Sequence, residues 1–202
     1  MTAIRAWFNL LRRRIWHVLF FRMLFGERSH GQYLPLTRIS PSTCIEHEAS
    51  LQLQNDVFIG HFNFIEASAG VSIGRGTQVT NFVSIISHST HRSVRVAGQL
   101  SGLDVAEGEA AVIRAPIRIG ERCFIGPHST VEAGTILGHG SLVAAHSRVR
   151  GVFPDFAVLA GSPAKVVGDS READAHWLEA HPQLRPAYDL WRAGLSPHGG
   201  AA

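Results

Sequence analysis

Apolar residues recur at every sixth position through the C-terminal half of the chain. The residue that follows each of them is often Gly or Ala. A spacing of six fits neither a helix, with 3.6 residues per turn, nor one long strand, whose side chains alternate with a period of two. It fits a parallel β-helix with three short strands per turn, in which the aliphatic side chains stack inward and the small residues permit turning. The aliphatic positions are Ile119, Ile125, Val131, Leu137, Val143 and Val149, and the small ones are Gly120, Gly126, Gly138 and Ala144.

The same spacing starts earlier in the chain but is interrupted there. Ile39, Ile45 and Leu51 keep the period, and two-residue slips separate the sets that follow. We expect the slips to mark loops that bulge from the coil, with the turn at 61–63 as one example. The segment 87–116 keeps no period at all. A long irregular excursion from a regular scaffold is where functional residues concentrate.

Aromatic and aliphatic residues between Ile4 and Phe25 predict an amphipathic N-terminal helix. Arginines at 12–14 and 22 interrupt its apolar run, which is therefore too short to span a bilayer. Two interpretations remain for residues 4–25. The helix lies peripherally on the anionic inner face of the cytoplasmic membrane, or it caps the solenoid or a neighbouring subunit.

The chain changes again after the repeats. Residues 171–181 predict a short amphipathic helix that docks on the solenoid or on an adjacent subunit, and residues 184–195 predict another helical turn. The sequence thus divides into a basic helix with a linker at 1–34, a β-helix at 35–168 and a C-terminal helix with a tail at 169–202.

Composition agrees with a turn-rich solenoid, because 20 of the 202 residues are Gly and only 17% are charged. Cys44 and Cys123 lie far apart in repeat-like segments, so we expect two core thiols in the reducing cytoplasm and no disulfide. Residues 1–30 hold six arginines and one acid, a surplus of five that leaves the remainder of the +3 chain at about −2. The β-helix is therefore not a basic surface for nucleic acid.

The hexads, together with the run AGSPAK from Ala160 to Lys165, resemble the left-handed β-helix, or hexapeptide-repeat, acyltransferases. The resemblance covers residues 39–168 and is closest to the sugar and polysaccharide O-acetyltransferases of the maltose and galactoside acetyltransferase type. It implies an all-β solenoid that is a left-handed parallel β-helix, assembled as a homotrimer. It also implies transfer of an acetyl group from acetyl-CoA to a sugar or glycan hydroxyl, with no metal. The acceptor itself is not specified by such a fold.

The stretch from Ile86 to His91 resembles the catalytic segment of these enzymes. Attack by an alcohol needs a base that titrates near neutral pH, and histidine is the natural one. In the family the base follows the aliphatic residue of this coil by five positions, and this spacing assigns the catalytic role to His91. His88 is the second candidate, either orienting His91 or touching the acceptor.

The resemblance also implies two binding sites. Coenzyme A is expected in a groove between subunits beside the C-terminal coils, where small turn residues meet the pantetheine arm and cations meet the phosphates. The sugar acceptor is expected against polar side chains of the N-terminal coils. The cofactor residues are Gly126, Ala144, Ala145, Arg150 and Lys165, and the acceptor residues are Asn63, Glu66, Ser68 and Asn81.

Several other functions stay open at this level. The same base could serve N-acetylation of an amino-sugar nucleotide, or acetylation of serine. A metal enzyme like the γ-type carbonic anhydrases would instead use His61, His88 and His91 as a zinc-binding trio that bridges subunits. An inert scaffold on the membrane would bind no coenzyme A.

Overall fold

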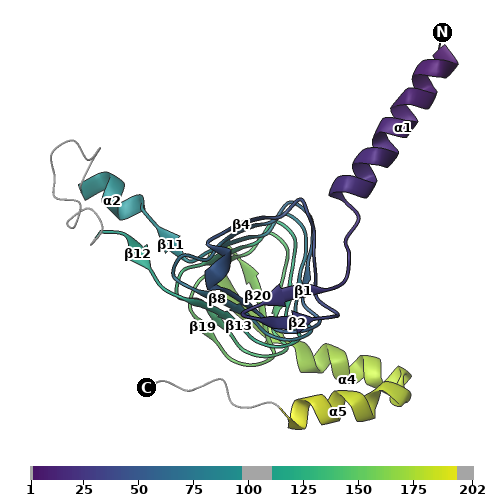
Figure 1. Cartoon of the computed structure of the whole chain (residues 1–202). Coiled ribbons are helices and arrows are strands. Elements are labelled where there is room, and N and C mark those ends of the chain that lie inside the picture. Colours follow the sequence, from purple (N-terminus) through teal and green to yellow (C-terminus); the bar gives the residue numbers. More distant parts are fainter. Residues whose placement is uncertain (1, 97–110, 195–202) are drawn as a thin grey trace.

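The computed structural model describes residues 2–96 and 111–194, and its centre is a parallel β-solenoid (Figure 1). The strands form three faces, and within each face strands of successive coils pair in parallel. The first face contains β3 (Arg38–Ile39), β6 (Phe58–Ile59), β9 (Gln78–Val79), β14 (Phe124–Ile125), β17 (Leu142–Val143) and β20 (Ala157–Gly161), with β21 (Ala164–Asp169) added antiparallel. The second contains β4 (Cys44–Glu46), β7 (Phe64–Glu66), β10 (Ser84–Ile86), β15 (Thr130–Glu132) and β18 (Arg148–Val149). The third contains β5 (Leu51–Leu53), β8 (Val71–Ile73), β13 (Ile117–Ile119), β16 (Ile136–Leu137) and β19 (Val152–Phe153).

The aliphatic hexads form the core of this solenoid. Ile125, Val131, Leu137, Val143 and Val149 are all fully buried. Strand pairing stacks equivalent residues of successive coils, so that each face contributes one inward column. The predicted parallel β-helix is confirmed.

The two-residue slips do not produce bulging loops, so that part of the prediction is wrong. They lie within the third face, where the strands β5, β8 and β13 each bury two residues instead of one. An added pair of residues keeps the inward and outward alternation of a strand intact, which is why the coil absorbs it. The turn at 61–63 is an ordinary corner between the first and second faces.

This corner is fixed by a buried amide and lined by a column of rings. Asn63 Nδ2 donates to the carbonyl oxygens of Gly60 at 3.0 Å and Thr80 at 2.7 Å, and its Oδ1 accepts from the Val83 amide at 2.7 Å. Outside it, rings at residues with positive φ stack from coil to coil at centroid distances of 5.1, 4.9 and 4.9 Å. The column consists of Phe62, Phe82, His128 and His146.

The two cysteines differ, which corrects the expectation of two core thiols. Burial raises the pKa of the Cys123 thiol to about 12, as expected of a core residue. Cys44 is exposed instead, because the first residue of β4 points outward while Ile45 points toward the core. Both cysteines are free thiols.

The N-terminal helix α1 (Thr2–Phe20) is shorter than the predicted span to Phe25. The chain leaves the helix because residues 21–26 attach it to the first coil. Phe21 packs on the rings of His61 and Phe62, and the Gly26 amide donates to the Thr37 carbonyl. A short antiparallel hairpin follows, formed by β1 (Glu27–Ser29) and β2 (Gln32–Leu34), and η1 (Glu48–Ser50) lies between β4 and β5. Within residues 2–96 and 111–194, no helix is both long and apolar enough to cross a bilayer.

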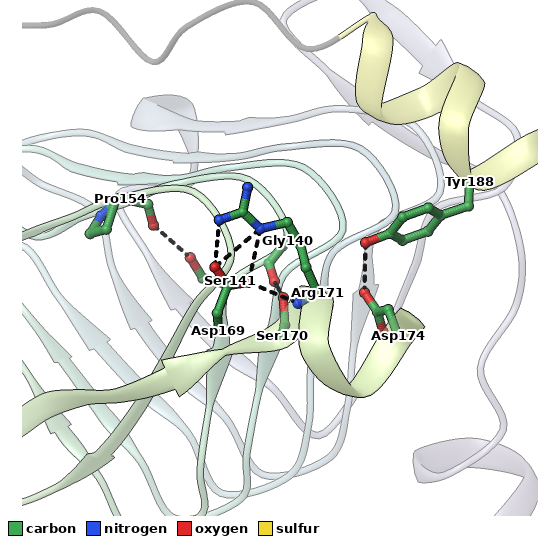
Figure 2. A network of polar contacts seen from close by, with 8 residues as sticks. All are labelled: Gly140, Ser141, Pro154, Asp169, Ser170, Arg171, Asp174 and Tyr188. Carbon is green, nitrogen blue, oxygen red and sulfur yellow. Dashed lines mark hydrogen bonds and ion pairs between the residues drawn. The ribbon is translucent and has the colours of Figure 1, made fainter. Parts of the chain in front are cut away.

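The C-terminal helices α4 (Ser170–Ala180) and α5 (Arg185–Ala193), joined by η2 (Pro182–Leu184), lie beside the solenoid (Figure 1), where Trp191 of α5 packs on Phe156 and on the guanidinium group of Arg122. Figure 2 shows the polar contacts that fasten them: Ser170 Oγ donates to the Gly140 carbonyl at 2.8 Å, and Tyr188 Oη donates to Asp174 at 3.0 Å. Asp169 caps α4 by accepting from the Arg171 amide. Leu178 and Trp191 are buried, so the predicted docking of this segment is confirmed.

We expect Asn63→Ala to lower the free energy of unfolding by about 2 to 4 kcal/mol, because it leaves buried backbone groups of the corner without partners. Asn81→Ala is the matched control. Asn81 lies at the same corner but is exposed and accepts one bond, from the His61 amide, so its loss should cost less than about 1 kcal/mol. Urea denaturation measures both. Equal losses would show that the buried amide does not fix the corner.

Candidate active site

The excursion begins and ends with two short strands that pair with each other. β11 (His88–Ser89) follows β10 after one residue, and it pairs antiparallel with β12 (Ile113–Arg114). A short helix, α2 (His91–Val96), continues the outgoing arm, and Figure 1 shows the arm projecting from one side of the solenoid. Residues 97–110 lie outside the described part, so the predicted segment is described only at its two ends. This arrangement fixes His88 at the root of the arm.

Glu66, the last residue of β7, is a buried carboxylate with 1% of its surface exposed. Strand pairing places Ile86 directly opposite it, which brings the next two residues of the chain within reach of its oxygens. Oε1 accepts from the Ser68 amide at 2.7 Å, and Oε2 accepts from Ser87 Oγ at 2.9 Å. His88 Nδ1 lies 2.7 Å from Oε2. A buried carboxylate needs such donors to offset its loss of hydration.

These contacts determine the charge of Glu66. Burial raises the pKa of the carboxyl group, but hydrogen bonds from Ser68, His88 and Ser87 outweigh it and lower the pKa from 4.5 to about 2. Glu66 is therefore ionised at neutral pH, and a carboxylate oxygen can only accept from Nδ1. We accordingly assign the Nδ1 proton to His88, which leaves Nε2 as the nitrogen able to take another.

His88 and His91 both line a pocket of about 310 Å³ at the edge of the second face. The His88 side chain is 32% exposed, so it is held from behind and open toward the pocket. His91 begins α2, and its Nδ1 is 2.7 Å from the exposed Ser89 hydroxyl. The two imidazoles thus have different partners. His88 contacts the buried carboxylate of Glu66, whereas His91 forms an exposed hydrogen bond with the hydroxyl group of Ser89.

Two arginines from the end of the second face complete the pocket wall. Arg148 Nη1 is 3.2 Å from both carboxylate oxygens of Glu132, so its charge is already paired. For Arg150, no polar partner is found in residues 2–96 or 111–194. Arg150 is exposed and is therefore available to an anionic group that enters the pocket.

The residues predicted for the two binding sites separate into two groups. Glu66 and Ser68 lie beside His88, with Ser68 Oγ 3.3 Å from its Nδ1, and Arg150 lines the same pocket. The others lie on the corner between the first and second faces, or on β21. This second group comprises Asn63, Asn81, Gly126, Ala144, Ala145 and Lys165.

Several members of the second group have structural roles of their own. Asn63 is engaged by the backbone of its corner, as described above. Gly126 is buried, and a Cβ there would lie 2.6 Å from the amide nitrogen of Ala145, so this position allows two coils to approach closely. Ala145 and Lys165 are exposed. In a single chain, the predicted cofactor residues therefore do not form one site.

The three histidines of the zinc hypothesis do not gather within one chain. His61 Nδ1 is 2.6 Å from Ser40 Oγ at the first corner, whereas His88 is held by Glu66. Over the described ranges 2–96 and 111–194, no group of three His, Cys, Asp or Glu side chains is arranged to hold a metal ion.

Sequence reasoning missed the contribution of Ser87 and assigned Glu66 to the acceptor. Both face the interior next to His88, and Ser87 is fully buried. A signal was present, because Ile65 and Ile85 are twenty residues apart and equivalent in the coil, which places Glu66 beside Ile86 and its neighbours. A charged residue so close to an inward position indicates a buried polar site.

Comparison with known proteins agrees with the repeat. The family described as bacterial transferase hexapeptide (six repeats) matches residues 111–151. A protein of Escherichia coli assigned to lipopolysaccharide biosynthesis as the O-acetyl transferase WbbJ is 31% identical over 62% of this chain and 64% of its own length. A protein of Mycobacterium tuberculosis assigned as an acetyltransferase is 30% identical over 62% of this chain and 39% of its own length. The chain therefore spans less than two thirds of either relative.

Two further proteins extend this result. The galactoside O-acetyltransferase of Escherichia coli is 28% identical over 59% of this chain and 55% of its own length. A variant of AntD, an N-acyltransferase from Bacillus cereus, solved with dTDP and coenzyme A, superposes with a TM-score of 0.52 at 14% identity, covering 71% of this chain and 88% of its own. The superposition supports the solenoid fold alone. The inferred resemblance to the hexapeptide-repeat transferases is confirmed.

We expect Glu66→Gln to remove a pH-dependent part of the stability. Because the carboxyl group titrates near 4.5 when unfolded and near 2 when folded, it stabilises the fold fully above pH 4.5, and this contribution is lost as pH falls toward 2. The difference in Tm between wild type and Glu66→Gln should thus be largest at neutral pH and shrink between pH 4.5 and 2. Glu132→Gln, which removes a more exposed ion pair, is the control. A difference that stays constant with pH would contradict this account of the carboxylate.

Proposed function

We propose that this chain is an acetyl-CoA-dependent O-acetyltransferase that acts on a sugar or glycan hydroxyl, with His88 as the general base. The observation that carries the proposal is the contact between the buried Glu66 carboxylate and His88 Nδ1 at 2.7 Å. This contact engages Nδ1 of the imidazole and leaves Nε2 available at the pocket that His88 lines. The similarity to proteins named as O-acetyltransferases supports the reaction class.

The reaction proceeds by direct attack. His88 Nε2 removes the proton from the acceptor hydroxyl as its oxygen bonds to the thioester carbonyl carbon. The carbon–sulfur bond then breaks, and the sulfur of coenzyme A leaves with the proton that His88 received. Acetyl has moved from sulfur to oxygen, and the imidazole is neutral again.

Glu66 acts through His88. It keeps the ring in one orientation and one tautomer, and its negative charge stabilises the imidazolium that exists between the two proton transfers. His91, ranked first by spacing, lies in the same pocket, but residues 2–96 and 111–194 give it no buried partner. The geometry therefore favours His88 as the base and His91 as a residue that contacts the acceptor.

The cofactor groove is proposed to form between two subunits of a homotrimer. In one chain, Arg150 at the His88 pocket does not meet Ala144 and Ala145 on the corner between the first and second faces or Lys165 on β21. The corner of a second copy placed against the pocket would bring them together. Arg150 would then pair with a phosphate of coenzyme A, and the exposed turn residues would meet the pantetheine arm. We propose that this activity is cytoplasmic, which is where acetyl-CoA is available, and the two unpaired cysteines are compatible with that compartment.

We expect His88→Ala to lower the turnover of acetyl transfer by about a hundredfold or more, as removal of a general base does. Binding of acetyl-CoA, measured by calorimetry, should stay within a few-fold of wild type. His91→Ala is the matched control and should lower turnover by less than about tenfold, because His91 is not oriented by a buried charge.

The acceptor panel for this assay should hold glycans, amino-sugar nucleotides and serine, so that an N-acetyltransferase or a serine acetyltransferase is detected as well. If His91→Ala lowered turnover more than His88→Ala did, the general base would be His91. Failure of the folded wild type to bind acetyl-CoA would overturn the proposal altogether.

We expect Arg150→Ala to weaken coenzyme A binding by about tenfold or more, since it removes a charge-assisted contact to phosphate. Arg118→Ala is the control, because Arg118 lies exposed on the third face. Binding of dephospho-coenzyme A, which lacks one phosphate, tests whether that phosphate is the one that Arg150 contacts. Similar affinities for both variants would exclude Arg150 from the groove.

A further inference from the structure

Helix α1 stands away from the solenoid over nearly its whole length, as Figure 1 shows. Its attachment is confined to the C-terminal end, where Phe21 packs on His61 and Phe62 at centroid distances of 5.3 and 5.6 Å. The helix therefore does not cap the coil of its own chain, which was one form of the capping interpretation of the sequence. The other form, a cap on a neighbouring subunit, is an outcome of the test below. The large apolar side chains of α1 are left at the surface.

Seven of these ten side chains form a continuous stripe, and Leu10, Trp16 and Phe20 lie on the other faces of the helix. Beginning at Ile4, the seven follow one another at intervals of three and four residues, the spacing that places side chains on one face of a helix. All are exposed, from 38% for Leu11 to 65% for Ile4. This apolar stripe consists of Ile4, Trp7, Phe8, Leu11, Ile15, Val18 and Leu19.

Arginines border the apolar stripe on both sides. At 3.6 residues per turn, Arg5 and Arg12 lie along one border and Arg14 lies along the other. Arg13 lies on the opposite face, and α1 contains no acidic residue. Such a helix presents a long apolar surface with two arginines along one side and one along the other.

From this geometry we infer that α1 docks on an anionic lipid surface. The helix lies parallel to the membrane, with the apolar stripe at the level of the upper acyl chains and the bordering arginines among lipid phosphates. Trp7 is amphipathic and suits the boundary between headgroups and acyl chains. The proposal goes beyond acyl transfer and does not depend on it.

Charge complementarity favours lipid over a second copy of the helix. Two α1 helices packed stripe to stripe would bring arginine borders together with no carboxylate between them, and like charges at such distances repel. An anionic membrane satisfies both requirements of the helix at once, because it buries the apolar stripe and neutralises its borders.

Co-sedimentation of the full chain with vesicles tests the inference. We expect strong binding to phosphatidylcholine vesicles that contain phosphatidylglycerol, and at least about tenfold weaker binding to phosphatidylcholine alone, since each arginine near an anionic surface contributes attraction. High salt should weaken the binding to anionic vesicles because it screens those charges. Equal binding to both lipids, or none to either, would overturn the proposal.

A pair of double variants separates the apolar stripe from the helix as a whole. Leu11→Asn with Ile15→Asn should lower binding by about tenfold or more, because two aliphatic side chains no longer enter the bilayer. Ala6→Asn with His17→Asn is the control, since these positions lie on the opposite face and asparagine disfavours the helix at least as much there. Equal losses would contradict a role for the stripe. Loss of oligomer mass in the stripe variant, with no lipid binding by wild type, would identify α1 as a contact between copies instead.

The two tryptophans of α1 report its orientation. Trp7 and Trp16 are nine residues apart, which is two and a half turns, so they lie on opposite faces. Brominated lipids should quench the fluorescence of the Trp16→Phe variant, which retains Trp7, more than that of the Trp7→Phe variant. Trp177 and Trp191 are common to both variants and cancel in the comparison. Equal quenching would overturn the proposed orientation.

Discussion

The interior of the solenoid is narrow, and this is the constraint on which the whole structure depends. In the C-terminal coils one aliphatic side chain from each face fills the space, and the same positions in the next coil must stack directly on it. Any other spacing would put a polar side chain inside or an aliphatic one outside. Extra residues are tolerated only as pairs within a strand, as on the third face, or as an excursion outside the coil. The corner amide of Asn63 and the ring column beside it keep successive turns in this register.

Because the constraint acts on each coil in the same way, it produces a repeating pattern of aliphatic residues that can be recognised in the sequence. The hexads from Ile119 to Val149 predicted the fold, and the helices at the C-terminus followed from apolar spacing. The predicted end of the N-terminal helix failed because of a contact distant in sequence, since Phe21 leaves its helix to pack on His61. Periodicity describes a residue relative to its neighbours and contains no information on such a contact. The outward position of Cys44, in contrast, follows from the alternation of its strand around Ile45, which the sequence pattern does contain.

The candidate site shows the same division. Spacing placed His88 and His91 at the start of the excursion and grouped Arg150 with an anion, and the structure brings all three to one pocket. Spacing ranked His91 above His88, and we propose the reverse order because of a contact with a carboxylate from the preceding coil that spacing does not contain. Nor could spacing distinguish polar side chains that fix a corner, such as Asn63, from those open to a ligand. A charge buried at Glu66 is costly unless every donor is in place, so the site and the scaffold are built from the same residues.

The pairing of β11 with β12 has a consequence for how such a protein diversifies. The two strands hold the ends of the excursion side by side, and the entropy of closing a longer segment between them rises only slowly with its length. The chain beyond the pair can therefore be lengthened, shortened or replaced at little cost to the coils, while His88 keeps its place on Glu66. On the mechanism proposed above, evolution can in this way exchange the excursion and retain the residues that would move the proton.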